Sequence, residues 1–180
     1  MIIHKLIVGP IRTNCYLLED EKTKNTVIID PGDEAGEIID LIERNGLRPR
    51  QIIITHNHYD HTGAVNELKE KYQISNPKLK QDDDVVFGDT VLKIIETPGH
   101  HSDDICIVDD KEGSIFTGDT LFKDTVGRTD LPQSDNKKMQ DSLRKFLQYS
   151  DDYKIYPGHG LDSTIGEEKE NNPFLKNLLI

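Results

Sequence analysis

Four strand-like runs in this chain end in a short turn that carries histidine or aspartate. The first run, Gln51–Thr55, leads into the segment His56-Asn57-His58-Tyr59-Asp60-His61. The other three end in the segments Thr97-Pro98-Gly99-His100, Phe116-Thr117-Gly118-Asp119 and Tyr156-Pro157-Gly158-His159. In these three, a glycine lets the backbone turn sharply just before the polar residue. Because imidazole and carboxylate are metal ligands, we expect the four strand ends to meet around metal ions.

The segment His56–His61 holds three histidines and an aspartate within six residues. A regular helix or strand could not direct all four side chains at one ion. A loop can spread them, so that His56 and His58 bind one ion while Asp60 and His61 bind another. The alternative is a polar loop that holds three of the seven histidines by chance. The three later strand ends favour the metal site.

Hydrophobic periodicity predicts strands separated by single helices. Strands are predicted over 2–8, 14–19, 26–30, 51–55, 85–87, 90–96, 104–109, 113–117 and 153–156. Helices are predicted near 34–45, 62–72 and 135–149, with Asp33 and Ser134 as N-caps of the first and last and Gly46 as a C-terminal stop. Strands in runs with few helices indicate an α+β protein of layered sheets with helices outside, in a single domain over 1–180.

Composition narrows the classes of protein that this chain can be. The net charge of −11 argues against binding nucleic-acid phosphates. The start MIIHKLIVG does not resemble a signal peptide, and no run approaches the roughly 18 apolar residues needed to cross a bilayer. Cys15 and Cys106 lie in strand-like runs and not in a CxxC pair, so we expect two buried free thiols, with a disulfide as the alternative. We therefore predict a cytoplasmic protein without a membrane partner.

The ordered motifs THxHxDH, TPGH, TGD and PGH resemble those of the metallo-β-lactamase superfamily. Further segments resemble its compact glyoxalase II-like branch, whose members are hydroxyacylglutathione hydrolase-like. These segments are Thr13-Asn14-Cys15-Tyr16, Ile29-Asp30-Pro31-Gly32, the run from Phe116 to Phe122, Gly127-Arg128-Thr129-Asp130, and the run from Ser163 to Lys169 followed by Asn172-Pro173-Phe174. The resemblance implies a four-layer αββα sandwich with metals at one edge of the paired sheets.

The resemblance also implies two divalent metal ions, with zinc as the first choice and iron or manganese as alternatives. The ligands implied are His56, His58 and His100 for the first ion, Asp60, His61 and His159 for the second, and Asp119 between the two. Asp30 is expected either to orient a ligand from behind or to form the turn before Pro31. His4 is expected to be structural, whereas His101 is ambiguous because it neighbours a predicted ligand.

The activity implied is hydrolysis of a small-molecule thioester such as S-lactoylglutathione by a hydroxide held between the metals, with Asp60 hydrogen-bonding that nucleophile. Arg128 and Lys123 are candidate contacts for the anionic substrate. The alternative for Arg128 is an ion pair with Asp130 or Asp124. Two other functions stay open: a persulfide dioxygenase that uses one iron, and a metal-bearing module without catalytic activity.

Overall fold

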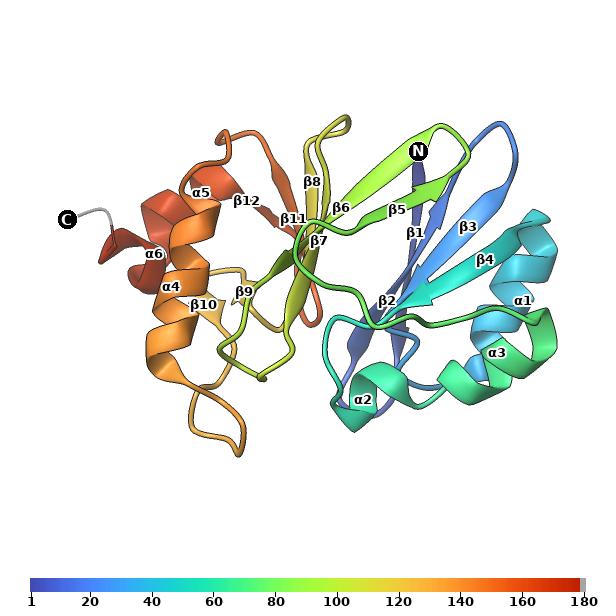
Figure 1. Cartoon of the computed structure of the whole chain (residues 1–180), viewed down its shortest axis with the longest axis horizontal. Helices are drawn as coiled ribbons and strands as arrows, with labels where there is room; N and C mark the ends of the chain where they lie inside the picture. The colour runs from blue at the N-terminus through green and yellow to red at the C-terminus, as the bar shows by residue number, and fades with distance from the viewer. Residues whose placement is uncertain (179–180) are drawn as a thin grey trace.

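Two β-sheets face each other in the computed structural model, which describes residues 1–178 (Figure 1). The first sheet has the order β1-β2-β3-β4, with bounds Ile2–Val8, Thr13–Glu19, Asn25–Ile29 and Arg48–Ile53. The second has the order β12-β11-β8-β7-β6-β5. Its bounds are Ser163–Thr164, Lys154–Pro157, Ser114–Gly118, Ile105–Asp109, Thr90–Glu96 and Asp84–Phe87. Both sheets are mixed, because β3 pairs with β4 and β8 with β11 in parallel.

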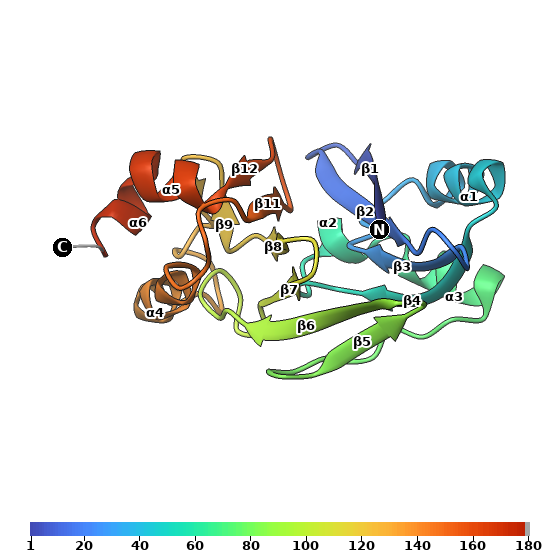
Figure 2. The ribbon, with the colours of Figure 1, turned by 90° about the horizontal axis from the view of Figure 1, so that it is seen from above.

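Helices lie on the outer side of each sheet, as Figures 1 and 2 show. The first sheet is covered by α1 (Ala35–Asn45) and α3 (Val65–Tyr72), and the second by α4 (Asn136–Phe146), α5 (Ile165–Asn171) and α6 (Pro173–Lys176). The short helix α2 (Tyr59–Thr62) lies beyond the end of β4, and a two-stranded ribbon pairs β9 (Leu121–Phe122) with β10 (Thr125–Val126). The predicted α+β architecture with four αββα layers is confirmed.

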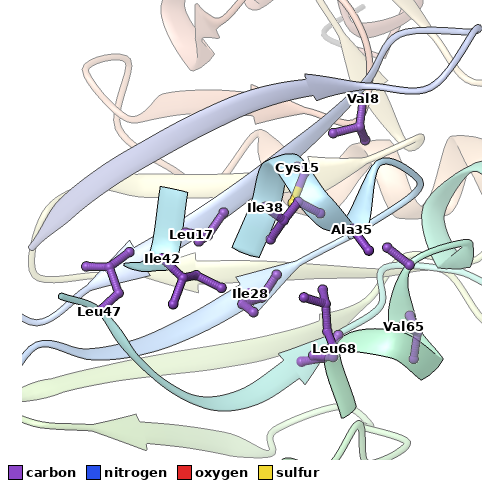
Figure 3. Packing of buried hydrophobic residues seen from close by; sticks show 12 residues of the cluster. Val8, Cys15, Leu17, Ile28, Ala35, Ile38, Ile42, Leu47, Val65 and Leu68 are labelled. Atoms are coloured by element: carbon purple, nitrogen blue, oxygen red, sulfur yellow. The ribbon is translucent and has the colours of Figure 1, made fainter. Parts of the chain in front are cut away.

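Three hydrophobic clusters correspond to the three interfaces between these layers. Ile38 of α1 and Leu68 of α3 pack against Ile28 of the first sheet, and Figure 3 shows this cluster. Val27 and Ile29, on the opposite face of the same strand, pack between the sheets with partners such as Phe116. The third cluster lies between the second sheet and α4. Because β3 is buried on both faces, its last three residues are apolar without alternation.

The two cysteines belong to different clusters. Cys15 lies under α1 and Cys106 under α4, so the two sheets separate them, and both are free and buried. The prediction of free thiols is confirmed and the disulfide alternative is wrong. Within the described residues, no helix is both long enough and apolar enough to cross a membrane.

Several predicted boundaries need correction. The N-cap of α1 is Glu34, not Asp33, because the chain turns at Glu34 with a φ of 51° while the Asp33 carboxylate accepts the Glu34 N–H. The N-cap of α4 is Asp135, not Ser134, because the Asp135 side chain accepts the N–H groups of the first helical turn. Gly46 ends α1 in the left-handed region, as predicted.

The strand predicted over 51–55 instead spans Arg48–Ile53. Its last two predicted residues, Ile54 and Thr55, lie beyond the end of the strand. The N–H of Thr55 donates to the Asp30 carboxylate, and its carbonyl accepts the N–H of Ile105 on β7 of the second sheet. The segment His56–His61 therefore lies in a loop and the short helix α2, and its side chains can point in different directions.

Candidate metal centre

The structure brings together all seven residues predicted as metal ligands. They form three overlapping groups in which all the donor atoms of a group lie within 4.8 Å of one another. The groups are His56, His58 and His100; His56, His61 and Asp119; and Asp60, His61 and His159. The side chains come from the segment after β4, the turn after β6, and the ends of β8 and β11.

Three imidazoles make up the first group. Nδ1 of His58 lies 2.9 Å from Nε2 of His56 and 3.0 Å from Nε2 of His100. Burial, followed by the neighbouring His61, lowers the pKa of His56 to about 2, and burial also lowers the pKa of His58. Both rings are therefore neutral at physiological pH, and neutral imidazole is the form that binds a metal.

Histidine and carboxylate alternate in the second part of the site. Nε2 of His61 lies 3.3 Å from Oδ2 of Asp60 and 3.4 Å from Oδ1 of Asp119. Nε2 of His159 lies 3.2 Å from Oδ2 of Asp60 and 3.6 Å from Oδ2 of Asp119. Asp119 also lies 3.6 Å from Nε2 of His100, so its carboxylate stands between the two outer groups.

Two buried atoms of this site have no hydrogen-bond partner within residues 1–178, namely Nε2 of His61 and Oδ1 of Asp119. Unpaired buried polar atoms are costly and rare in folded proteins. Burial alone would raise the pKa of Asp119, but the interaction with His61 and the charges of His61 and His56 lower it to about 2. A negative carboxylate among inward-facing imidazole nitrogens is a donor set that a divalent cation fits.

Asp30 lies directly behind His61. Its Oδ2 is 2.9 Å from Nδ1 of His61, and the carboxylate also accepts the backbone N–H of Thr55 at 2.7 Å and its hydroxyl at 2.6 Å. With Nδ1 of His61 donating to Asp30, Nε2 is left to face the cluster. The contact supports the orienting role for Asp30, in addition to its place in the turn before Pro31.

A second buried carboxylate, Asp104, was not identified from the sequence. Its Oδ2 accepts the backbone N–H of His101 at 2.6 Å, and its Oδ1 lies 3.9 Å from Nδ1 of His56. Burial is the main cause that raises its pKa to about 8, and the negative charge of Asp119 adds to the rise. The strand predicted over 104–109 includes Asp104, but β7 begins at Ile105. An acidic residue directly before a fully apolar run was the only available signal.

Backbone and hydroxyl groups also position the candidate ligands. The carbonyl oxygen of Arg128 lies 3.0 Å from Nδ1 of His100, and the Thr13 hydroxyl donates to Oδ2 of Asp60 at 3.2 Å. The backbone N–H of Asn14 donates to the Gly158 carbonyl at 2.7 Å, next to His159. The sequence links Thr13 and Asn14 to this site only through the resemblance, and the structure shows their contacts with it.

The two predicted substrate contacts are engaged in ion pairs. Arg128 donates from Nε and Nη2 to the Asp130 carboxylate, at 2.9 and 3.0 Å, which is one of the two alternatives considered for it. Nζ of Lys123 lies 3.3 Å from Glu167. Both cations are exposed. The structure gives neither of them a free position facing the cluster.

The two remaining histidines stand outside the ligand groups. His4 pairs with the buried carboxylate of Glu19 at 2.7 Å, in keeping with the structural role expected for it. His101 is buried, and its Nδ1 contacts Asp103. His100, and not His101, therefore belongs to the ligand groups.

An αββα sandwich with a histidine and aspartate cluster at the strand ends defines a class of metal-binding proteins. The sequence profile of the metallo-beta-lactamase superfamily matches residues 8–77 and 73–159 of this chain. The chain belongs to that superfamily, and the resemblance found in its motifs is confirmed.

Known proteins of different activity are similar to this chain over nearly its full length. Hydroxyacylglutathione hydrolase GloC of Haemophilus influenzae is 34% identical, over 98% of this chain and 99% of its own. Among solved structures, the BLEG-1 B3 metallo-beta-lactamase is 30% identical with a TM-score of 0.90, over 97% of this chain and 99% of its own. ETHE1 from Myxococcus xanthus is 30% identical with a TM-score of 0.89, over 96% of this chain and 84% of its own. A protein solved in a di-iron-bound form, TTHA1623, is 32% identical with a TM-score of 0.84, over 96% of this chain and 100% of its own.

Proposed function

We propose that this protein is a metal-dependent hydrolase of thioesters, with hydroxyacyl thioesters of glutathione such as S-lactoylglutathione as the substrate class. The observation that carries the proposal is the complete set of seven donor residues in overlapping groups. The similarity to a hydroxyacylglutathione hydrolase over nearly the whole of both chains supports the choice of substrate.

Hydrolysis adds one water across the bond between the acyl carbon and sulfur, and it releases a carboxylic acid and a thiol. Two divalent ions, when bound, supply Lewis acidity and lower the pKa of a coordinated water. His56, His58 and His100 would hold one ion, Asp60, His61 and His159 the other, and Asp119 would be shared. Zinc is the ion we propose first, and the di-iron form of a similar protein keeps iron as an alternative.

Asp60 is placed to handle the proton of the attacking water. Burial favours its neutral form, but the interactions with His159 and His61 outweigh burial and hold its pKa well below the usual range. The Thr13 hydroxyl donates to the same carboxylate oxygen, Oδ2. A carboxylate that stays ionised and is fixed by a neighbouring donor can accept a hydrogen bond from water and orient it for attack.

The test is elemental analysis of the purified protein together with hydrolysis of a thioester panel, for the wild type and for Asp119→Ala. We expect about two metal ions per chain in the wild type. The variant should lose most of its metal and at least about tenfold in rate, because the shared carboxylate contacts both groups. Asp141→Ala, which removes an exposed carboxylate from α4, is the matched control and should retain both properties. Full metal occupancy in Asp119→Ala would contradict the assigned role.

A second candidate, a persulfide dioxygenase with one iron, is favoured by the similarity to ETHE1. The complete group Asp60, His61 and His159 favours two ions and therefore hydrolysis. An oxygen electrode with glutathione persulfide separates the two functions, since one iron per chain and oxygen uptake would overturn the hydrolase. Full metal loading without hydrolysis of any thioester or oxygen uptake would instead indicate a non-catalytic module.

A further inference from the structure

Two adjoining cavities, which together we call the Lys78 cleft, open beside the first histidine group. One has a volume of about 500 Å³ and is lined in part by His56, and the other has a volume of about 510 Å³ and is lined in part by His58. Asn57, Lys78 and Asp103 line both cavities. Because His56 and His58 belong to one ligand group, a molecule in this cleft lies next to the candidate metal centre.

Lys78 is the one lysine or arginine among the residues that line the two cavities. The other charged group that both cavities share, Asp103, contacts Nδ1 of His101. Lys78 is exposed, and within residues 1–178 its ammonium group forms no ion pair or hydrogen bond. In a chain of net charge −11, a free cation beside the site is the group that an anionic substrate would meet.

The segment that carries Lys78 is anchored at both ends. Ser75 accepts the N–H of Ile52 on β4 at 2.9 Å, and Asp82 donates to the carbonyl of Ile94 on β6 at 3.0 Å. In Figure 1 this segment is the green connection between α3 and β5, which passes from the helix side of the first sheet to the second sheet. The backbone around Lys78 therefore has a defined place beside the cleft.

The rest of the lining indicates what kind of molecule fits. Apolar side chains from several elements contribute to the first cavity, and Leu131 and Pro132 contribute to the second. The apolar residues of the first cavity are Ile54, Val65, Pro77, Leu79 and Ile105. An occupant with an aliphatic part and a carboxylate would match both the apolar surface and the single lysine.

We propose that Lys78 is the specificity-determining cation of this site and that it binds a carboxylate of the substrate. This inference rests on the proposed thioester hydrolysis. The carboxylate can belong to the thiol half, as in glutathione, or to the acyl half, as in a succinyl group. Lys78 thus takes the role of substrate contact that was predicted for Arg128 and Lys123, whose side chains pair with acidic neighbours.

The experiment compares wild type, Lys78→Met and Lys78→Arg as metal-loaded full-length proteins. The substrates are S-lactoylglutathione, the uncharged lactoyl thioester of N-acetylcysteamine and the succinyl thioester of N-acetylcysteamine. For Lys78→Met we expect KM to rise about tenfold more for a carboxylate-bearing thioester than for the uncharged one, because a charge-assisted hydrogen bond is lost. Lys78→Arg should recover most of the loss. A loss confined to S-lactoylglutathione assigns the carboxylate to the thiol half, and a loss confined to the succinyl thioester assigns it to the acyl half.

The matched control is Lys111→Met, which removes the same charge from an exposed position in the turn between β7 and β8. It should leave every KM unchanged, and all variants should keep the metal content of the wild type. Equal KM values for wild type and Lys78→Met on all three substrates would overturn the inference while leaving thioester hydrolysis intact. If no thioester is hydrolysed, the proposed function fails, and binding of glutathione and succinate by calorimetry still decides the role of Lys78. Wild-type and Lys78→Met proteins with the same dissociation constants would then overturn it.

Discussion

Asp30 and Asp104 are two buried carboxylates that lie behind the candidate ligands His61 and His56, in contrasting surroundings. Asp30 accepts two hydrogen bonds from Thr55 and contacts His61. Asp104 accepts a hydrogen bond on one oxygen, and its Oδ1 is buried without a partner in the described part of the chain. Environment, and not residue type, therefore decides that Asp104 has a raised pKa of about 8 and can hold a proton near neutral pH.

Replacing the titratable carboxyl group of Asp104 should change how the stability of the metal-free protein depends on pH. Between the ordinary pKa of 3.8 and the raised value of about 8, the folded protein binds a proton on Asp104 that the unfolded chain releases. Stability therefore falls as pH rises through this window, and Asp104→Asn should remove that part of the fall. We expect the variant to gain at least about 1.4 kcal/mol on the wild type between pH 5 and pH 8, equivalent to one pKa unit.

Urea denaturation at several pH values in the presence of a chelator measures this difference. Asp141→Asn serves as the control, because that carboxylate is exposed on α4 and should leave the pH dependence unchanged. Parallel stability curves for wild type and Asp104→Asn would show that Asp104 does not titrate in the way inferred.

The turns at the strand ends pack tightly on the candidate ligand residues. A Cβ atom on Gly32, in the turn after β3, would lie 1.7 Å from the carbonyl oxygen of Asp60. A Cβ atom on Gly158, after β11, would lie 2.3 Å from Oδ1 of Asp119. The backbone of these two turns therefore contacts the candidate ligands Asp60 and Asp119 directly, which is possible only because Gly32 and Gly158 have no side chain.

Gly32→Ala should displace the segment that carries Asp60 and His61. We expect it to destabilise the fold by about 1–3 kcal/mol, the usual cost of overpacking. We also expect it to weaken metal binding at least about tenfold, as the loss of a group that supports a metal ligand does. Gly36→Ala is the matched control, because a Cβ there has open space and lies within α1. That control should stabilise the protein by about 0.4–1 kcal/mol. Denaturation curves and a competitive metal titration measure both effects, and normal metal affinity in Gly32→Ala would refute the packing argument.

At the scale of the molecule, the candidate site lies where the two sheets meet. His56, His58, Asp60 and His61 follow β4 of the first sheet, whereas His100, Asp119 and His159 follow strands of the second. Close to them, the Tyr16 hydroxyl of β2 donates to the carbonyl of Pro157 on β11 at 2.7 Å. Metal ions bound by ligands from both sheets would therefore join the two halves of the sandwich.

Removing the metals should lower the thermal midpoint of the whole protein. A ligand present at 1,000 times its dissociation constant stabilises the native state by about 4 kcal/mol. For a domain of this size each kcal/mol corresponds to about 2–4 °C, so chelation should lower the midpoint by about 10 °C. Scanning calorimetry before chelation, after chelation and after metal is restored measures the change. Identical midpoints would indicate that the cluster does not bind metal in the native state.

Sequence patterns predicted the elements well where hydrophobic periodicity was strong. Met139, Leu143 and Phe146 of α4 form the buried face that their spacing indicated, and Gly46 ends α1 as predicted. Helix starts were less predictable, because Asp33 and Ser134 are both of a type that caps helices, yet the local backbone places the caps one residue later, at Glu34 and Asp135. The short strands β9, β10 and β12 were missed because each has only two residues.

The sequence by itself determined the α+β sandwich and the seven candidate ligands. Four of these residues follow one strand within a run of six, and each of the other three follows a strand end and a glycine directly in the chain. Only the tertiary structure decided that Asp104 stands behind His56, that Arg128 pairs with Asp130 and contacts His100 through its carbonyl, and that Lys78 borders the cleft. For Asp104, His100 and Lys78, the partners lie tens of residues away along the chain. Their proximity depends on how two sheets pack face to face, which no local spacing of residues records.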